Sequence, residues 1–135
     1  MANVKKINGY DLIDSKSDYS TSEIDTGKKW IDGKTIYRKV IDTGATVPDE
    51  DQTDKNVAHG ITNLGTIVSL QCYAYTDTTT FTLPFSIIQA LHVVTLNVLI
   101  NDTNIRFLFN DDTGGHQSPL ACDNSYAIIE YTKSE

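Results

Sequence analysis

Basic residues, cysteines and long apolar runs are all scarce in this chain of 135 residues. Its 11 Lys and Arg face 18 Asp and Glu, and the formal net charge of −7 argues against general binding to nucleic acid or to an anionic membrane. No run approaches the ~18 apolar residues of a membrane-spanning helix. The polar N-terminal segment lacks the apolar core of a signal peptide, so we expect the chain to be made and folded in a cytoplasm.

The two cysteines, Cys72 and Cys122, form no CxxC pair and lie in apolar, strand-like contexts. We therefore expect buried, reduced thiols, with a disulfide as the minority alternative.

Motifs that carry catalysis are also missing. His59, His92 and His116 have no partner at metal-ligand spacing, and the chain contains neither HExxH nor GxSxG. The acidic loop 48–54 offers hard oxygen ligands for calcium, but the spacing of an EF-hand is not met and a solvated loop explains it better. The same holds for the acidic segment 111–115. We expect no enzymatic activity, no cofactor and no metal.

Turn residues separate short stretches that favour β-strands, and helical periodicity is almost absent. Asp32-Gly33, a preferred dipeptide of type I′ turns, predicts a hairpin between 29–31 and 34–41. A second hairpin is expected at 101–104. Further β-branched and aromatic runs predict strands over 66–75, 81–85, 93–100, 105–109 and 126–132, with loops over 42–56 and 111–123. Residues 86–91 fit either a helical turn or a loop. The pattern predicts an all-β chain, an antiparallel β-sandwich preceded by a mostly extended N-terminal arm.

Two of the expected strands have mixed faces. Between Ile36 and Ile41, apolar and charged side chains occur on both sides of the strand. In 66–75 the alternate positions from Thr66 to Ala74 form the more apolar face, and Tyr73 and Tyr75 point outward. Mixed faces favour a sheet edge or a subunit interface, which predicts an oligomer.

The sequence divides after residue 28, with the sandwich domain over 29–135. Residues 1–28 contain scattered apolar positions without a periodic pattern: Val4, Ile7, Tyr10, Leu12 and Ile13. Alone, such a segment buries too little surface to offset its ordering entropy. It either docks onto the domain, docks onto another protein, or remains a disordered terminus.

A distinctive pattern, YST.E...G.WIDGK.IYRK.I, runs from Tyr19 to Ile41. NVAHGITN at 56–63 and AIIEYTK at 127–133 follow it in order. Together these pieces resemble a segment that recurs in small virion proteins of tailed bacteriophages and prophages, on head fibres, tail fibres and baseplates alike.

The resemblance implies a virion structural protein that is assembled in the cytoplasm of the host bacterium. It implies a homotrimeric appendage on head or tail, whose N-terminal arm attaches it to capsid or tail proteins. The signature is shared by appendages that meet different receptors, so its residues are expected to serve the fold or a subunit interface. They include Trp30, Asp32, Gly33, Tyr37, Arg38, His59 and Tyr131.

A receptor-binding module is the alternative. Aromatic side chains can stack on the sugar rings of a host cell-surface polysaccharide, although core packing or a subunit interface explains them as well. The aromatic candidates are Trp30, Tyr37, Tyr73, Tyr75 and Phe85. The receptor-facing loops would then be 77–80, 85–92 and 110–123.

Overall fold

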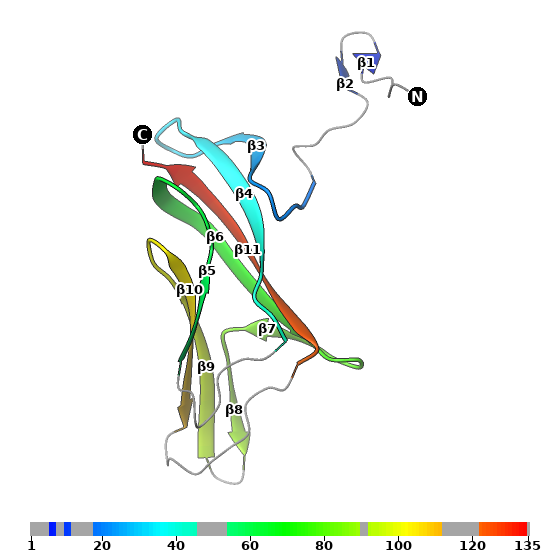
Figure 1. Ribbon diagram of the computed structural model, residues 1–135, viewed down its shortest axis with the longest axis vertical. Coiled ribbons are helices and arrows are strands. Elements are labelled where there is room, and N and C mark those ends of the chain that lie inside the picture. Colours follow the sequence, from blue (N-terminus) through cyan, green and yellow to red (C-terminus); the bar gives the residue numbers. More distant parts are fainter. Residues whose placement is uncertain are drawn as a thin grey trace.

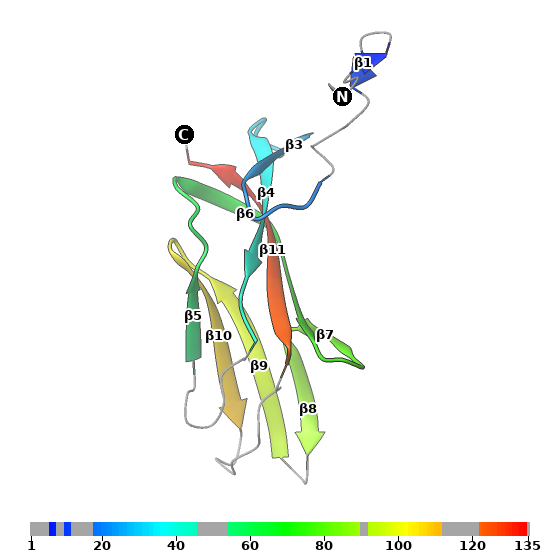
Figure 2. The same cartoon turned by 45° about the vertical axis from the view of Figure 1, so that its right-hand side comes forward.

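The computed structural model describes Lys6–Ile7, Tyr10–Asp11 and residues 18–45, 54–89, 92–111 and 122–134. In these residues the chain is all-β, with antiparallel pairing throughout and no helix. Two sheets face each other in a sandwich, as Figures 1 and 2 show. The predicted all-β fold, an antiparallel β-sandwich, is therefore confirmed. No helix long and apolar enough to cross a membrane occurs in the described part of the chain.

The larger sheet has five strands in the order β3-β4-β11-β6-β7, and the smaller has four in the order β5-β10-β9-β8. The larger consists of β3 (Ile24–Lys29), β4 (Thr35–Asp42), β6 (Leu64–Tyr75), β7 (Thr80–Leu83) and β11 (Asn124–Lys133). The smaller consists of β5 (Asp54–Ala58), β8 (Phe85–Gln89), β9 (His92–Ile100) and β10 (Asn104–Asp111). Two short strands, β1 (Lys6–Ile7) and β2 (Tyr10–Asp11), pair with each other in a third sheet.

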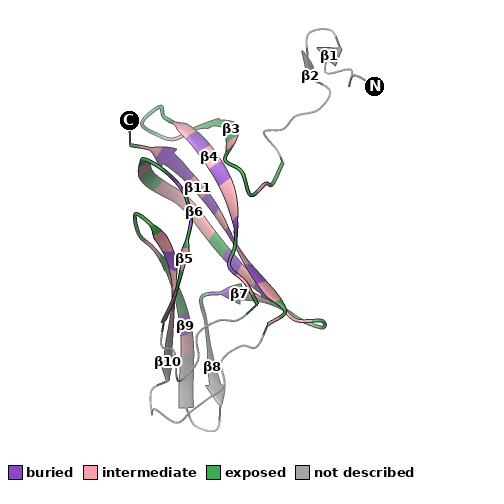
Figure 3. Cartoon of the chain, in the orientation of Figure 1, coloured by how far each residue is buried: buried purple, intermediate pink, exposed green. Residues whose placement is uncertain are grey.

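The core lies between the two large sheets, and the central strand β11 shows why. Its alternate residues Ser125, Ala127, Ile129 and Tyr131 are buried, whereas the residues between them are half-buried on the outer face (Figure 3). The smaller sheet contributes a set of buried apolar side chains that includes Leu96, Ile105 and Phe107. The period of two along β11 is the expected signature of a strand with one face on the core.

Strand β6 follows the predicted alternation only in its second half. Cys72 and Ala74 are buried as expected, but the register against β11 slips between Ser69 and Ile67. A β-bulge adds one residue to a strand, so the side chains before it change faces. Ile67, predicted to point outward, therefore packs against the core.

The predicted hairpin between 29 and 41 exists, but its turn is not type I′. Gly33 N–H donates to Trp30 O at 2.9 Å, Trp30 N–H donates to Lys34 O at 2.9 Å, and Gly33 has φ +86°. A type I′ turn needs positive φ at both central residues, and Asp32 is not among the non-glycine residues with positive φ. The loop is instead a three-residue turn closed by a glycine bulge. Asp32 Oδ1 stabilises it by accepting the Lys34 N–H at 2.9 Å.

Three boundaries also need correction. Strand β3 begins at Ile24, so the sheet includes residues 24–28, which the sequence assigned to the arm. Strand β5 begins at Asp54, inside the expected 42–56 loop, because β10 offers it a pairing edge. Residues 86–89 form neither a helical turn nor a loop but most of β8, which pairs with β9. The acidic positions 49–51 of the calcium candidate lie outside the described residues.

Candidate functional site

Four signature side chains meet at the end of the larger sheet where β11 finishes. Tyr131 Oη donates to Glu23 Oε1 at 2.6 Å, and Lys133 Nζ lies 2.8 Å from the same oxygen. The Tyr37 ring stacks on the Tyr131 ring with centroids 6.1 Å apart, and Lys133 Nζ lies 5.5 Å from the Tyr37 centroid. We call Glu23, Tyr37, Tyr131 and Lys133 the Glu23 cluster. It joins the residues just before β3 to the last residues of β11.

The electrostatics of the cluster favour an ionised Glu23 and a neutral Tyr131. Burial alone would raise the pKa of Glu23, but hydrogen bonds from Lys133 and Tyr131, with the charges of Lys133 and Lys39, leave it below its ordinary value. Burial raises the pKa of Tyr131, and the hydrogen bond to Glu23 and its negative charge raise it further. The Tyr131 hydroxyl is therefore held as a hydrogen-bond donor.

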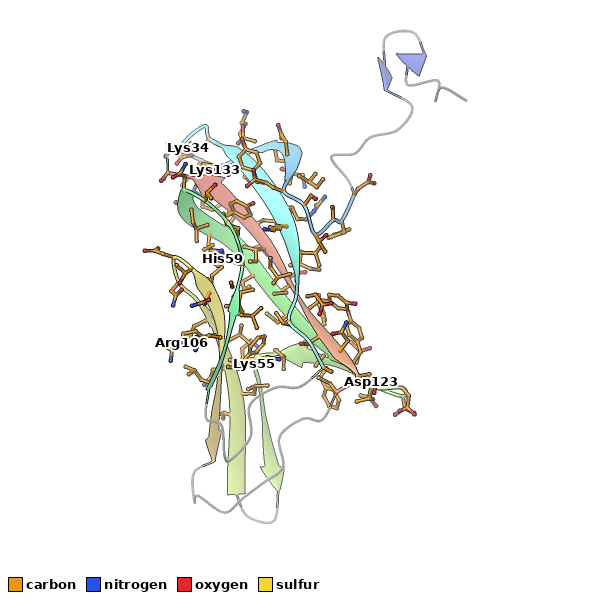
Figure 4. The ribbon with its side chains drawn as sticks, in the orientation of Figure 1. Lys34, Lys55, His59, Arg106, Asp123 and Lys133 are labelled. Atoms are coloured by element: carbon orange, nitrogen blue, oxygen red, sulfur yellow. The ribbon has the colours of Figure 1, made fainter. Side chains whose placement is uncertain are left out.

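A pocket of about 240 Å³ opens beside the Glu23 cluster. It is lined by Gly33, Lys34, Thr35, Tyr37 and Lys133. Lys34 and Lys133 lie close together at this end of the molecule in Figure 4, one from the β3–β4 turn and one from β11. Lys29 Nζ donates to Thr35 Oγ1 at 2.8 Å and so helps to hold the Thr35 side chain in the wall of the pocket.

The segment 18–22, which we call the strap, runs along β4 before β3 begins. Ser20 O accepts the Val40 N–H at 2.9 Å, and Asp18 O accepts a hydrogen bond from Arg38 Nη2 at 2.9 Å. The Tyr19 ring lies under the Arg38 guanidinium, 4.4 Å from centroid to Cζ. Glu130 Oε2 lies 3.5 Å from Arg38 Nη1. Arg38, on the outer face, is thereby buried within one chain, so the mixed faces of β4 do not require a second subunit.

His59 is buried in the sandwich, and both of its ring nitrogens have partners. It is 2 % exposed, its Nδ1 accepts the Ile61 N–H at 3.0 Å, and its Nε2 lies 2.9 Å from Asn101 O. Lys39 Nζ donates to the His59 carbonyl at 2.9 Å. The residue thus ties the chain after β5 both to the β9–β10 turn and to β4, and Figure 4 shows it in the body of the sandwich.

The remaining aromatic candidates separate into two groups. Tyr73 and Tyr75 form a cluster with Tyr126 on the outer face of the larger sheet. The ring centroids of Tyr73 and Tyr75 are 6.5 Å apart, and those of Tyr75 and Tyr126 are 5.9 Å apart. Tyr126 was not singled out from the sequence, although its period-two position beside Ile128 places it on that face. Trp30 is half-buried in the β3–β4 turn. The side chain of Phe85 lies outside the described part of the structure.

The arm residues are only partly described. Ile7 and Tyr10 are paired residues of the β1–β2 sheet. Val4, Leu12 and Ile13 lie outside the described residues. Of the receptor-loop candidates, 77–80 forms the β6–β7 turn and the start of β7, 85–89 is β8, and 112–121 lies outside the description.

Both cysteines are free, Cys72 buried and Cys122 only half-buried. Burial raises the pKa of the Cys72 thiol to about 12. Where the structure describes side chains, no group of three or more His, Cys, Asp or Glu is placed to hold a metal ion. No protein-family model, curated protein or solved structure matches the chain.

Proposed function

We propose that the chain is a bacteriophage virion structural protein, a subunit of a homotrimeric head or tail appendage that attaches through its N-terminal arm. The observation that carries the proposal is how the strap is fastened to the sandwich. Between Asp18 and Glu23 the chain is held by a backbone hydrogen bond to β4, by the Arg38 guanidinium and by the charged contacts of Glu23. A segment that links an attachment arm to a domain must resist being pulled away, and these contacts supply that resistance.

The described part of the arm consists of one short pair of strands. Strands β1 and β2 form a sheet of their own and do not extend either sandwich sheet (Figure 1). A two-stranded sheet is marginally stable alone in water. Docking onto a capsid or tail protein would supply the surface that such a hairpin needs.

The trimer rests on the resemblance and on the outer face of the larger sheet. Tyr73, Tyr126 and Ile128 are half-buried there, with Gln71 exposed between them. A patch of apolar and aromatic side chains on an outer sheet face is typical of an interface.

Deletion of residues 1–17 tests the attachment role. The deletion stops before the strap, so the Glu23 cluster and the Arg38 contacts remain intact. A control variant replaces residues 1–17 with a Gly/Ser segment of equal length, which preserves the reach of the arm. Both variants should keep the native mass of the full-length protein and be missing from purified particles. Incorporation of either variant at the full-length level would contradict the proposal.

A receptor-binding module is the second candidate, and the Tyr73–Tyr75–Tyr126 cluster is the observation that favours it. Three aromatic rings on one outer face can stack on the sugars of a host polysaccharide. Saturable binding of the isolated protein to host cells, lost in Tyr73→Ala and Tyr75→Ala, would support this candidate. Binding that survives both substitutions would contradict the role of the cluster.

A further inference from the structure

We propose that the pocket beside the Glu23 cluster binds a small anionic group, a carboxylate or a phosphate. This inference goes beyond the virion role and does not depend on it. The five lining residues carry two positive charges and no negative one. The two charges come from Lys34 and Lys133, which the fold brings together from distant parts of the sequence.

The positive charge of the pocket contrasts with the chain as a whole, whose formal net charge is −7. Two ammonium groups on one small pocket repel each other, and an anion between them removes that cost. Lys34 is exposed and forms no ion pair with the residues described. Its ammonium group is therefore available to a ligand.

Two neighbouring acids, Asp32 and Glu23, already accept hydrogen bonds within the protein. Asp32 Oδ1 accepts the backbone N–H of Lys34 at 2.9 Å and holds the turn in shape. Glu23 contacts Lys133 at 2.8 Å and uses one of its three N–H donors. The remaining donors of Lys133, those of Lys34 and the Thr35 hydroxyl are left to bind a ligand oxygen.

Glu23 shows that this environment stabilises a carboxylate. Its pKa is lowered although burial opposes ionisation, because hydrogen bonds and the Lys133 charge outweigh the loss of solvent. An acidic group in the pocket would meet the free donors of Lys133, the Lys34 ammonium and the Thr35 hydroxyl, whereas the Tyr131 hydroxyl stays with Glu23. Hydrogen bonds between an ammonium and a carboxylate or phosphate are about twice as strong as neutral ones.

The size of the pocket limits the ligand. At about 240 Å³ it lies below the range of about 300–1,000 Å³ typical of drug-sized ligands. It suits one acidic group or a single acidic sugar-sized unit. Its walls are the β3–β4 turn, the start of β4 and the end of β11, and backbone hydrogen bonds fix all three.

The test is a titration of the full-length protein, followed through its backbone amide NMR signals. Inorganic phosphate is added in one series and acetate in another, with the ionic strength held constant by sodium chloride. Saturable shifts of the Gly33, Lys34 and Thr35 amides in either series are expected, and the series that produces them identifies the acidic group. Shifts that fail to saturate in both series would overturn the proposal.

Two matched pairs of variants make the test specific. Lys34→Gln should weaken binding about tenfold, as expected for loss of a charge-assisted hydrogen bond. Lys28→Gln, at an exposed β3 position outside the pocket, should leave it unchanged. Equal weakening by both would show a diffuse charge effect and overturn the assignment of the pocket.

The second pair removes a negative charge. Glu23→Gln keeps an acceptor for Tyr131 and Lys133 but releases the Lys133 charge, so binding should strengthen. Asp25→Asn removes another exposed carboxylate two residues farther along the chain, on β3. In the wild type, Asp25 Oδ1 accepts the Gly27 N–H at 2.7 Å. Asp25→Asn should strengthen binding less than Glu23→Gln does. An equal effect of the two would contradict a site built on Lys133.

Discussion

The hydrogen bond from Tyr131 to Glu23 can be removed with little change in shape by Tyr131→Phe. Tyr131 is fully buried, and its hydroxyl lies 2.6 Å from the Glu23 carboxylate. Hydrogen bonds to charged groups contribute about 1.5–3 kcal/mol. The lower end applies because the Glu23 side chain is still 35 % exposed and keeps Lys133 as a partner. We therefore expect a loss of about 1.5 kcal/mol in the free energy of unfolding.

Thermal unfolding followed by circular dichroism measures this loss. In a domain of this size, 1 kcal/mol corresponds to roughly 4 °C in the melting temperature, so Tyr131→Phe should melt about 6 °C lower. Tyr126→Phe is the matched control, since Tyr126 lies on the same strand and its hydroxyl has no hydrogen bond to the described residues. It should melt within about 2 °C of the wild type.

The pH dependence of the stability difference between the wild type and Tyr131→Phe shows whether ionised Glu23 causes that difference. The pKa of Glu23 is lower in the folded state than its ordinary value of 4.5. Ionised Glu23 therefore stabilises the fold fully at pH values above 4.5, and this stability is lost as the pH falls through the folded-state pKa. The gap between wild type and Tyr131→Phe should be full at pH 7 and shrink below pH 4.5. An equal gap at both pH values, or equal melting of Tyr131→Phe and Tyr126→Phe, would refute the reasoning.

Three further predictions concern the core and β11. Gly65→Ala places a Cβ 2.8 Å from the main-chain carbon of Lys133, which cannot rotate away. Unfolding in urea should show a loss of about 1–3 kcal/mol in the free energy of unfolding, and an unchanged midpoint would contradict the close approach. Ile129→Ala should cost about 2–5 kcal/mol because Ile129 is fully buried, and the half-buried Ile128→Ala clearly less; equal costs would contradict the assigned faces of β11. Iodoacetamide at pH 8 should leave Cys72 of the folded protein unmodified in peptide mass spectra, because its pKa of about 12 keeps the thiol protonated. Rapid modification would contradict the burial of Cys72.

The fold class could be predicted from the sequence because its main signal is local. β-Branched and aromatic runs separated by turn residues indicate strands, and the period of two along β11 assigns its faces. Strand β5 was missed because its acidic start reads as a loop and its partner lies about 50 residues away on β10. β8 was missed because Pro84 and the short apolar run after it fit several local structures, and only pairing with β9 decides among them.

Register changes are harder to predict than strands. The bulge in β6 moves Ile67 to the core, yet nothing in the alternation of residues 64–75 marks the position where the extra residue enters. Gly65 is the nearest signal, since a glycine within a strand often marks a bulge or a close backbone approach. The β11 main chain lies close enough to Gly65 to exclude a side chain.

Of the Glu23 cluster, the sequence singled out Tyr37 and Tyr131, as residues of the fold or of a subunit interface, and gave Glu23 and Lys133 no role of their own. The signature contains Glu23, Tyr37 and Lys133, yet their contacts depend on β3 and β11 lying on either side of β4. The mixed faces between Ile36 and Ile41 suggested a sheet edge or an interface, whereas the strap of the same chain covers Arg38. A strap held by backbone carbonyls has little sequence signal, because every residue carries a carbonyl.

Light scattering coupled to size-exclusion chromatography of the full-length protein tests the central claim most directly. The account of a homotrimeric appendage subunit predicts a mass three times the 15.0 kDa of the chain, unchanged on dilution. A mass of one chain at every concentration would contradict it.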